Sequence, residues 1–292
     1  MNVAPAGQMR AVTTIVAYAV RESLRRRVFL VVLVLTVGFL VLYGVGAHFA
    51  FRDARSFAGS GRIVDPTAFT GATIFGLALF AILFLAAVLA VFLTLGVVRG
   101  DAESGLLQPL IVRPLGRTTM LLSRFAGAAG ISAVYVLAVY LVALVLTGVI
   151  GSWWPDHVVG PGLALMAAAV VIAAISLLAA VFLSATAQGI AVLMIYGAGL
   201  TAGLLGQIGH AIDSHTLKSI ARVATWAVPF EALYQAGLHA LVSNTTGLTG
   251  AILQLGPFGG AQASGIGLVA WSALYVAAFL AIAVSAFARR DL

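Results

Sequence analysis

The stretch from Arg99 to Arg124 reads RGDAESGLLQPLIVRPLGRTTMLLSR, and it separates two long apolar runs of the chain. Six of its 26 residues are charged, whereas charged residues make up only 9% of the whole sequence. Each flanking run is long enough to cross a bilayer, which takes about 20 mostly apolar residues. We therefore expect this stretch to be a polar insertion between two membrane spans.

The rest of the chain has the composition of a membrane protein that crosses the bilayer several times. Hydrophobic residues make up 62% of the 292 residues, and the mean hydropathy is +1.12. Six segments of spanning length contain no Asp, Glu, Lys or Arg: residues 28–50, 70–98, 125–150, 162–184, 189–209 and 265–288. We expect an all-α polytopic membrane protein with six transmembrane helices in a single domain, 1–292. The absence of cysteine excludes disulfides and thiolate metal sites.

The distribution of basic residues predicts the orientation of these spans. If the N-terminus is cytoplasmic, eleven of the sixteen basic residues and the whole net charge of +7 lie on the inner side. This asymmetry is what the positive-inside rule describes. We expect a multi-pass protein of the cell (inner) membrane with both termini in the cytoplasm. The inner arginines suit anionic lipid head groups, so the basic character does not call for nucleic acid.

Two flanking regions are predicted to lie at the membrane interfaces. Residues 1–27 have the pattern of an amphipathic helix, which is either an elbow helix packed on a cytoplasmic partner or a plain arginine cluster that sets topology. Residues 210–264 form an extracytoplasmic loop, in which we expect short helices resting in the outer interface and separated at Pro229. This loop either gates a substrate path or is anchored by an aromatic belt.

Within the polar insertion, apolar residues follow one side of a short helix. The apolar residues are Leu106, Leu107, Leu110 and Ile111. Asp101 and Glu103 lie at its start and Arg113 near its end, where each charge favours the helix dipole. Pro109 and Pro114 limit the element to one or two turns. Such a helix can fit a groove on another protein.

The order of residues here resembles a known family. The pattern Glu103-x-Gly105-x-Leu107-x-x-Leu110-Ile111-x-x-Pro114-Leu115-x-Arg117 is similar to that of the type-2 ATP-binding-cassette exporter permeases. The resemblance extends to the architecture and is closest to the branch of multidrug, sodium and copper-processing export systems. Two positions depart from the family pattern: Leu106, where threonine is frequent, and Gly116, where serine is frequent.

The resemblance implies that the insertion is a coupling helix seated in a cleft of a separate ATPase subunit. The residues expected to couple are Glu103, Gly105, Leu106, Leu107, Leu110, Ile111, Arg113, Pro114 and Arg117. The apolar side chains would be the buried anchor, and the charged ones would set the register. The partner ATPase, in two copies, would bind ATP and Mg, because a phosphate-binding loop needs a lysine and the only lysine here is Lys218 in the outer loop. We expect no cofactor in this chain and no enzymatic activity of its own.

The fifth span carries the candidate pathway residues. Because no span contains a charged residue, we expect a hydrophobic or amphipathic substrate. The resemblance to exporter permeases implies that the direction is export. The polar and small residues of interest, beside Gln188, are Tyr196, Gly199, Thr201, Gly203 and Gln207. Gly199 and Gly203 allow close helix approach, either within one bundle or at an interface with a second permease copy or paralogue that encloses the path.

Other functions have weaker support in the sequence. The same spans would serve an ATPase-driven scaffold that does mechanical work on an extracytoplasmic partner subunit, or a channel. An intramembrane enzyme would need a catalytic cluster, and Asp101 with Glu103 is the only close acidic pair. His210, Asp213 and His215 could face a metal ion if they fold together, but they also suit an ordinary polar loop.

Overall fold

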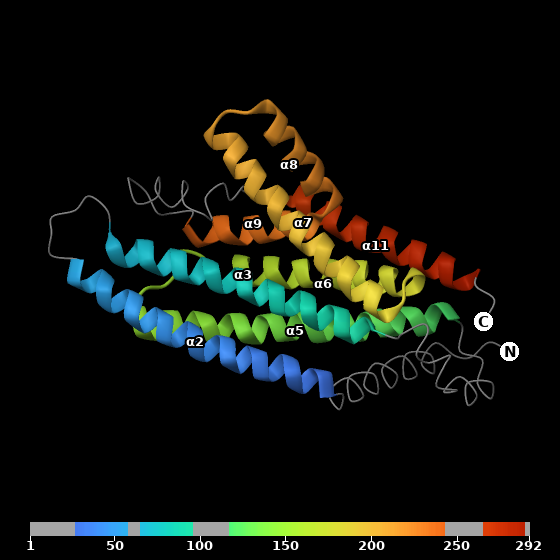
Figure 1. The fold of residues 1–292 in the computed structure, drawn as a ribbon, viewed down its shortest axis with the longest axis horizontal. Coiled ribbons are helices and arrows are strands. Elements are labelled where there is room, and N and C mark those ends of the chain that lie inside the picture. The colour runs from blue at the N-terminus through green and yellow to red at the C-terminus, as the bar shows by residue number, and fades with distance from the viewer. Residues whose placement is uncertain (1–26, 58–64, 96–116, 243–264, 290–292) are drawn as a thin grey trace.

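The computed structural model describes residues 27–57, 65–95, 117–242 and 265–289, and within them it contains eight helices and no strand. Six of the helices are long and apolar enough to cross a membrane. The described part of the chain is therefore all-helical, and its six apolar helices indicate a multi-pass membrane protein (Figure 1). The helices are α2 (Arg27–Phe57), α3 (Pro66–Thr94), α5 (Arg117–Gly151), α6 (Val159–Phe182), α7 (Ala185–Ala211), α8 (His215–Ala227), α9 (Pro229–Val242) and α11 (Ile266–Ala288).

Two helices extend further than the apolar runs predicted. α2 continues through Arg52 to Phe57, and α5 begins at Arg117 instead of residue 125. Residues 117–124 therefore belong to the first turns of α5, and the insertion between the two spans is shorter than expected. A helix need not end where its apolar stretch ends, because its backbone hydrogen bonds can continue into the membrane–water interface.

The start of α3 shows how local sequence fixes a helix boundary. Asp65 is the N-cap, and its Oδ1 accepts hydrogen bonds from the backbone N–H groups of Thr67 at 2.9 Å and Ala68 at 3.3 Å. Pro66 follows at the first helical position, where its missing N–H costs nothing. The helix then runs 29 residues without a charged side chain.

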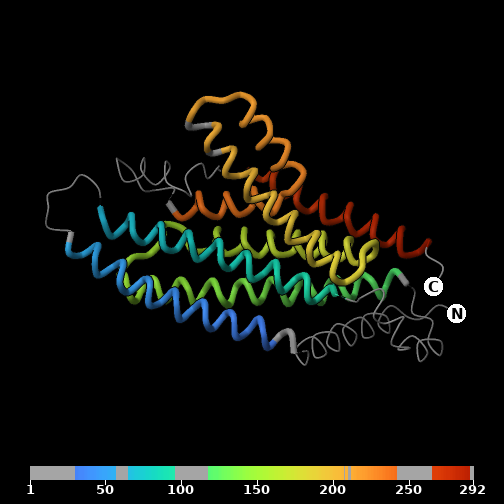
Figure 2. Tube along the Cα trace, viewed as in Figure 1, coloured from blue at the N-terminus to red at the C-terminus, as the bar shows by residue number. Residues whose placement is uncertain are grey.

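α3 and α6 form the centre of the bundle. In each, 67% of the most apolar 18-residue window is buried, compared with 22% in α2 and α7 and 11% in α11. α5 and α9 complete the main core, which includes Leu79, Tyr140, Leu165 and Phe230. The tube in Figure 2 follows the long helices side by side, with α7 crossing the others obliquely. The outer helices leave apolar faces uncovered, as expected for surfaces that meet lipid.

At one end of the bundle, aromatic side chains pack directly against glycines of neighbouring helices. A Cβ added at Gly71 would come within 2.3 Å of the Trp153 ring, and one at Gly151 within 2.2 Å of the Phe51 ring. These glycines let the rings lie directly on the helix backbones, so the ends of α2 and α5 and the start of α3 pack together. This is the end that the charge distribution assigns to the outer side.

The region before the last span differs from the expectation. α8 ends at Ala227 and α9 begins at Pro229, so the predicted break is present. α9 does not rest on the surface, however, because it packs against α6, α3, α7 and α11. Its apolar residues Phe230, Leu233, Leu238 and Leu241 are all buried in the main core. At 14 residues, α9 is too short to be found as a span, although its apolar side matches the interior of the bundle.

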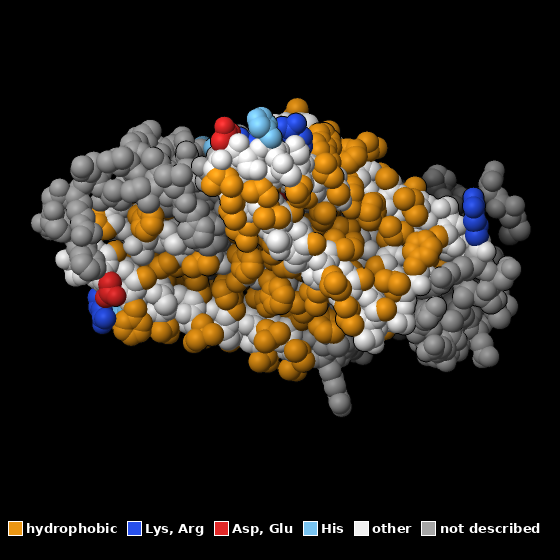
Figure 3. Space-filling model, turned by 45° about the horizontal axis from the view of Figure 1, so that its top comes forward, with side chains coloured by type: hydrophobic (Ala, Val, Ile, Leu, Met, Phe, Trp, Pro, Cys, Tyr) orange, Lys and Arg blue, Asp and Glu red, His pale blue; other side chains and the backbone are white. Residues whose placement is uncertain are grey.

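The surface separates into apolar and charged zones. In the view of Figure 3, hydrophobic side chains cover the middle of the molecule, and the charged side chains that are described lie at its ends and at the tip formed by α7 and α8. At that tip Lys218 forms an ion pair with Asp213. Charges at the extremities and an apolar girdle between them suit a protein that spans a bilayer.

Candidate functional site

The predicted coupling residues fall almost entirely outside the described part of the chain. Eight of them lie there: Glu103, Gly105, Leu106, Leu107, Leu110, Ile111, Arg113 and Pro114. Arg117 is the first residue of α5, and its side chain is not described. The ATPase-coupling role of this segment stays a prediction. What the structure does describe is how the helices on both sides of the segment are held.

The helix that leads into the insertion is fixed by a buried polar cluster. Gln188 of α7 donates from Nε2 to Thr94 Oγ1 at 2.9 Å, and to the carbonyl oxygen and Oγ of Ser176 at 3.2 Å each. The hydroxyls of Thr94 and Ser176 are 2.7 Å apart. All three side chains are at most 1% exposed. Hydrogen bonds among buried polar groups join the end of α3 to α6 and α7.

The helix that leads out of the insertion is fixed by apolar packing. Leu121 of α5 lies in a second core cluster with Leu177 and Val181 of α6 and with Ala283 and Phe287 of α11. Leu121 is 1% exposed, so the first turns of α5 are firmly seated. A displacement of the insertion would therefore reach α6 and α7 through the end of α3. It would reach α6 and α11 through the start of α5.

Three of the predicted pathway residues lie at the contact between α7 and α9. Tyr196 is buried and stacks on Phe230, with ring centroids 5.7 Å apart. A Cβ added at Gly199 would come within 2.8 Å of the Phe230 ring, and one at Gly203 within 1.9 Å of Glu231 Oε1. The close helix approach at these glycines is thus made inside one chain. Their role in a pathway stays a prediction.

The opposite side of α7 is exposed. Thr201 lies there and donates to the carbonyl oxygen of Gly197 at 2.9 Å, and a Cβ added at Gly197 would meet nothing within 4 Å. Met194, one turn earlier, is 69% exposed. The exposed side of α7 consists of Ile190, Met194, Gly197, Thr201, Leu204 and Ile208. Gln207 belongs to α7, but its side chain is not described.

Glu231 is a buried carboxyl that the sequence reasoning placed outside the bundle. It is 5% exposed, and its Oε1 accepts a hydrogen bond from Gln235 Nε2 at 2.7 Å. Burial raises the pKa of Glu231 to about 7, and the hydrogen bond from Gln235 lowers it in part. α9 is not one of the six spanning helices, so the search for charges within spans missed this residue. The sequence did contain a sign that Glu231 is unusual, because it is the only charged residue between Arg222 and Arg289.

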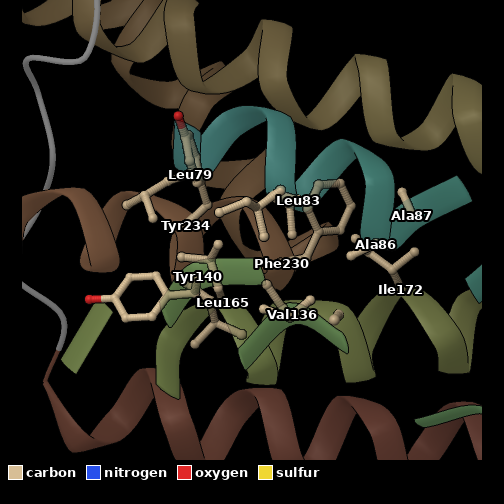
Figure 4. Packing of buried hydrophobic residues seen from close by; sticks show 14 of the residues in the cluster. Leu79, Leu83, Ala86, Ala87, Val136, Tyr140, Leu165, Ile172, Phe230 and Tyr234 are labelled. Carbon is tan, nitrogen blue, oxygen red and sulfur yellow. The ribbon is translucent and has the colours of Figure 1, made fainter. Parts of the chain in front are cut away.

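The residues beside Glu231 on α9 pack near the mid-length of the bundle. Phe230 and Tyr234 lie beside Leu83 and Leu79 in the middle of α3 (Figure 4). A charged side chain at that depth costs about 2.5–3.5 kcal/mol on insertion scales. The carboxyl therefore favours a neutral form in this arrangement.

The described residues give no support for a metal centre. Among them, no three His, Cys, Asp or Glu side chains are close enough to share a metal ion. His215 is exposed at the start of α8, Asp213 pairs with Lys218, and the side chain of His210 is not described. The arrangement suits a polar turn at the tip of the molecule.

Comparison with known proteins does not identify the family of this chain. No protein-family model matches the chain, and no curated protein matches it.

Proposed function

We propose that this chain is the permease subunit of an ATP-binding-cassette exporter. Two permease copies, identical or paralogous, would work with two copies of an ATPase subunit. The ATPase would bind ATP and Mg and push on the segment from Glu103 to Arg117. The substrate would be hydrophobic or amphipathic, and it would leave the cytoplasm across the cell membrane.

The observation that carries the proposal is the position of the family-like motif. It lies between the second and third spanning helices, on the side where the basic residues gather. It has an apolar side for docking and charged residues for register, as a helix that fits a groove requires. Its pattern resembles that of the type-2 exporter permeases over fifteen residues, Glu103 to Arg117.

The packing on both sides of the motif supports a mechanical role. The cluster of Thr94, Ser176 and Gln188 ties the end of α3 to α6 and α7. The cluster around Leu121 ties the start of α5 to α6 and α11. Rigid connections of this kind can pass a displacement of the motif from α3 and α5 to three further helices, α6, α7 and α11. α7 would then carry the movement to its contact with α9.

The exposed side of α7 is the best candidate for contact with the second permease. It is apolar, and it has a glycine and a threonine at its centre, Gly197 and Thr201, which permit close approach of another helix. The other side of α7 is occupied by α9 of the same chain. A subunit interface on α7 would therefore use Thr201 and its exposed neighbours.

Replacing the charged residues of the motif tests the coupling. We expect Glu103→Gln and Arg113→Gln each to reduce transport per ATP hydrolysed at least about tenfold in a reconstituted complex, because the loss of about 1.4 kcal/mol of contact energy has that effect. Asp53→Asn, at an exposed position near the end of α2, is the matched control outside the motif and outside the proposed interface. Membrane insertion should be unchanged in all three variants. Normal transport and normal coupling in both motif variants would contradict the proposal.

A further inference from the structure

The contact between α7 and α9 contains a carboxyl and several polar oxygens in an otherwise apolar setting. Besides Glu231, the hydroxyls of Tyr196 and Tyr234 and the Oε1 atom of Gln235 are buried, and they have no hydrogen-bond partner within the part of the chain that the structure describes. Tyr196 is 4% and Tyr234 is 3% exposed. Buried polar atoms without partners are rare in native proteins, and they often mark a functional site.

These groups lie close to one another. Gln235 donates to Glu231 at 2.7 Å, and Gly203 of α7 lies against both side chains. Burial raises the pKa of Tyr234, and the neighbouring Tyr196 and Glu231 add to the rise. In Figure 4 the hydroxyl oxygen of Tyr234 points away from Leu165 and Val136 of the main core. The polar atoms thus gather where α9 meets α7.

Few titratable residues lie on the elements packed around α9. The ranges of α3 and α6 contain no titratable residue. On α8, Lys218 pairs with Asp213, and His215 and Arg222 are exposed. The remaining titratable residues are Tyr234 and His239 on α9, Tyr196 and His210 on α7, and Tyr275 on α11. Among the described residues, no basic side chain forms an ion pair with Glu231.

The size of the site indicates what it can bind. Gly203 is in direct contact with the carboxyl, because a Cβ there would come within 1.9 Å of Oε1, and Gly199 lies directly under the Phe230 ring. Ca²⁺ and Mg²⁺ take six or more oxygen ligands, whereas a proton needs one oxygen. The tight contact therefore suits a proton and leaves no space for a substrate molecule.

We propose that Glu231 is a proton-binding site, and that loss of its proton loosens the contact between α7 and α9. The neutral carboxyl can stay packed against Gly203. The ionised carboxyl needs water or a counter-charge, and its close packing against Gly203 restricts water until α9 moves away from α7. The opening of this contact is thereby linked to pH. The inference rests on the α7–α9 geometry and does not require a partner ATPase.

Infrared spectroscopy tests the proton directly. The full-length chain in lipid nanodiscs would be titrated between about pH 5 and pH 9. Carboxyls with ordinary pKa values are mostly ionised throughout this pH range. We expect the C=O band of a protonated carboxyl to disappear with a midpoint near 7. Glu231→Gln should abolish this band, and Asp53→Asn should keep it, because Asp53 is exposed at the end of α2. A wild-type chain without a band that titrates near neutral pH, or a band that persists in Glu231→Gln, would overturn the proposal.

A second variant keeps the test decisive if Glu231→Gln does not fold. Gln235→Leu removes the hydrogen bond that lowers the pKa of Glu231, so the midpoint should move to higher pH. An unchanged midpoint would mean that the titrating group is not Glu231.

Thermal unfolding of the same samples tests the link to packing. The pKa of Glu231 is raised on folding, so its stabilising effect is complete below 4.5 and falls as the pH rises to about 7. The melting temperature of the wild-type chain should fall through this range relative to that of Glu231→Gln. Parallel curves for the two proteins would contradict the link.

Discussion

At the scale of single residues, a few buried polar groups stand out against an apolar background. Thr94, Ser176 and Gln188 hydrogen-bond to one another at the end of α3, and Glu231 is buried and accepts a hydrogen bond from Gln235. The two sites therefore have different consequences. A hydrogen-bonded cluster holds helices together, and a buried carboxyl can gain or lose a proton.

The cluster around Gln188 predicts a specific pattern of stabilities. Gln188→Leu should lower the free energy of unfolding by about 1–2 kcal/mol, because it leaves two buried hydroxyls with fewer partners. The triple replacement Thr94→Val, Ser176→Ala and Gln188→Leu should recover part of that loss, because it removes those hydroxyls as well. Equilibrium unfolding of the full-length chain in mixed micelles would measure both.

Thr201→Val is the control for this series. Thr201 is exposed, and it donates a hydrogen bond to Gly197 of its own helix, so its replacement should change stability by less than about 0.5 kcal/mol. A loss in the triple variant larger than in Gln188→Leu would show that the cluster is not a cooperative unit.

At the scale of the helices, α7 has two sides with different uses. One side packs on α9 through Tyr196, Gly199 and Gly203, and the other is exposed around Gly197 and Thr201. α9 contributes a buried face although it is too short to span the membrane. The α7–α8–α9 region thus combines a site inside the chain with a surface open to a neighbour.

Cross-linking tests the exposed side of α7 as a subunit interface. The chain has no cysteine, so a single introduced cysteine reports on one position. We expect Met194→Cys, but not Val134→Cys on α5, to form a disulfide-linked permease pair in native membranes after mild oxidation. The two positions are a matched pair, 69% and 67% exposed. Equal cross-linking of both, or of neither, would count against this interface.

At the scale of the whole molecule, the sequence predicted the number and order of the spans because each is a long uncharged run. The six predicted segments correspond to six apolar helices of the structure. The start of α5 at Arg117 and the burial of α9 could not be predicted in this way. Both depend on tertiary packing: Leu121 seats the first turns of α5, and the core accepts a helix of 14 residues.

The candidate sites were predicted unevenly for the same reason. Tyr196, Gly199 and Gly203 were selected from the sequence, but their partner α9 was expected at the surface. Glu231 was therefore assigned to an outer loop, although it is the only charge between Arg222 and Arg289. The coupling segment remains a prediction from its motif, because residues 96–116 lie outside the described part of the chain.

The most direct test of the central claim is to purify the native complex and cross-link it from the motif. Leu107→Cys, carrying a short photoreactive cross-linker, would be expressed in the full-length chain, and the assembly would be isolated in mild detergent. We predict that a nucleotide-hydrolysing subunit copurifies with the permease and is the main cross-linked product. An assembly without such a subunit, or a cysteine at position 107 that is labelled from outside intact cells, would contradict the account.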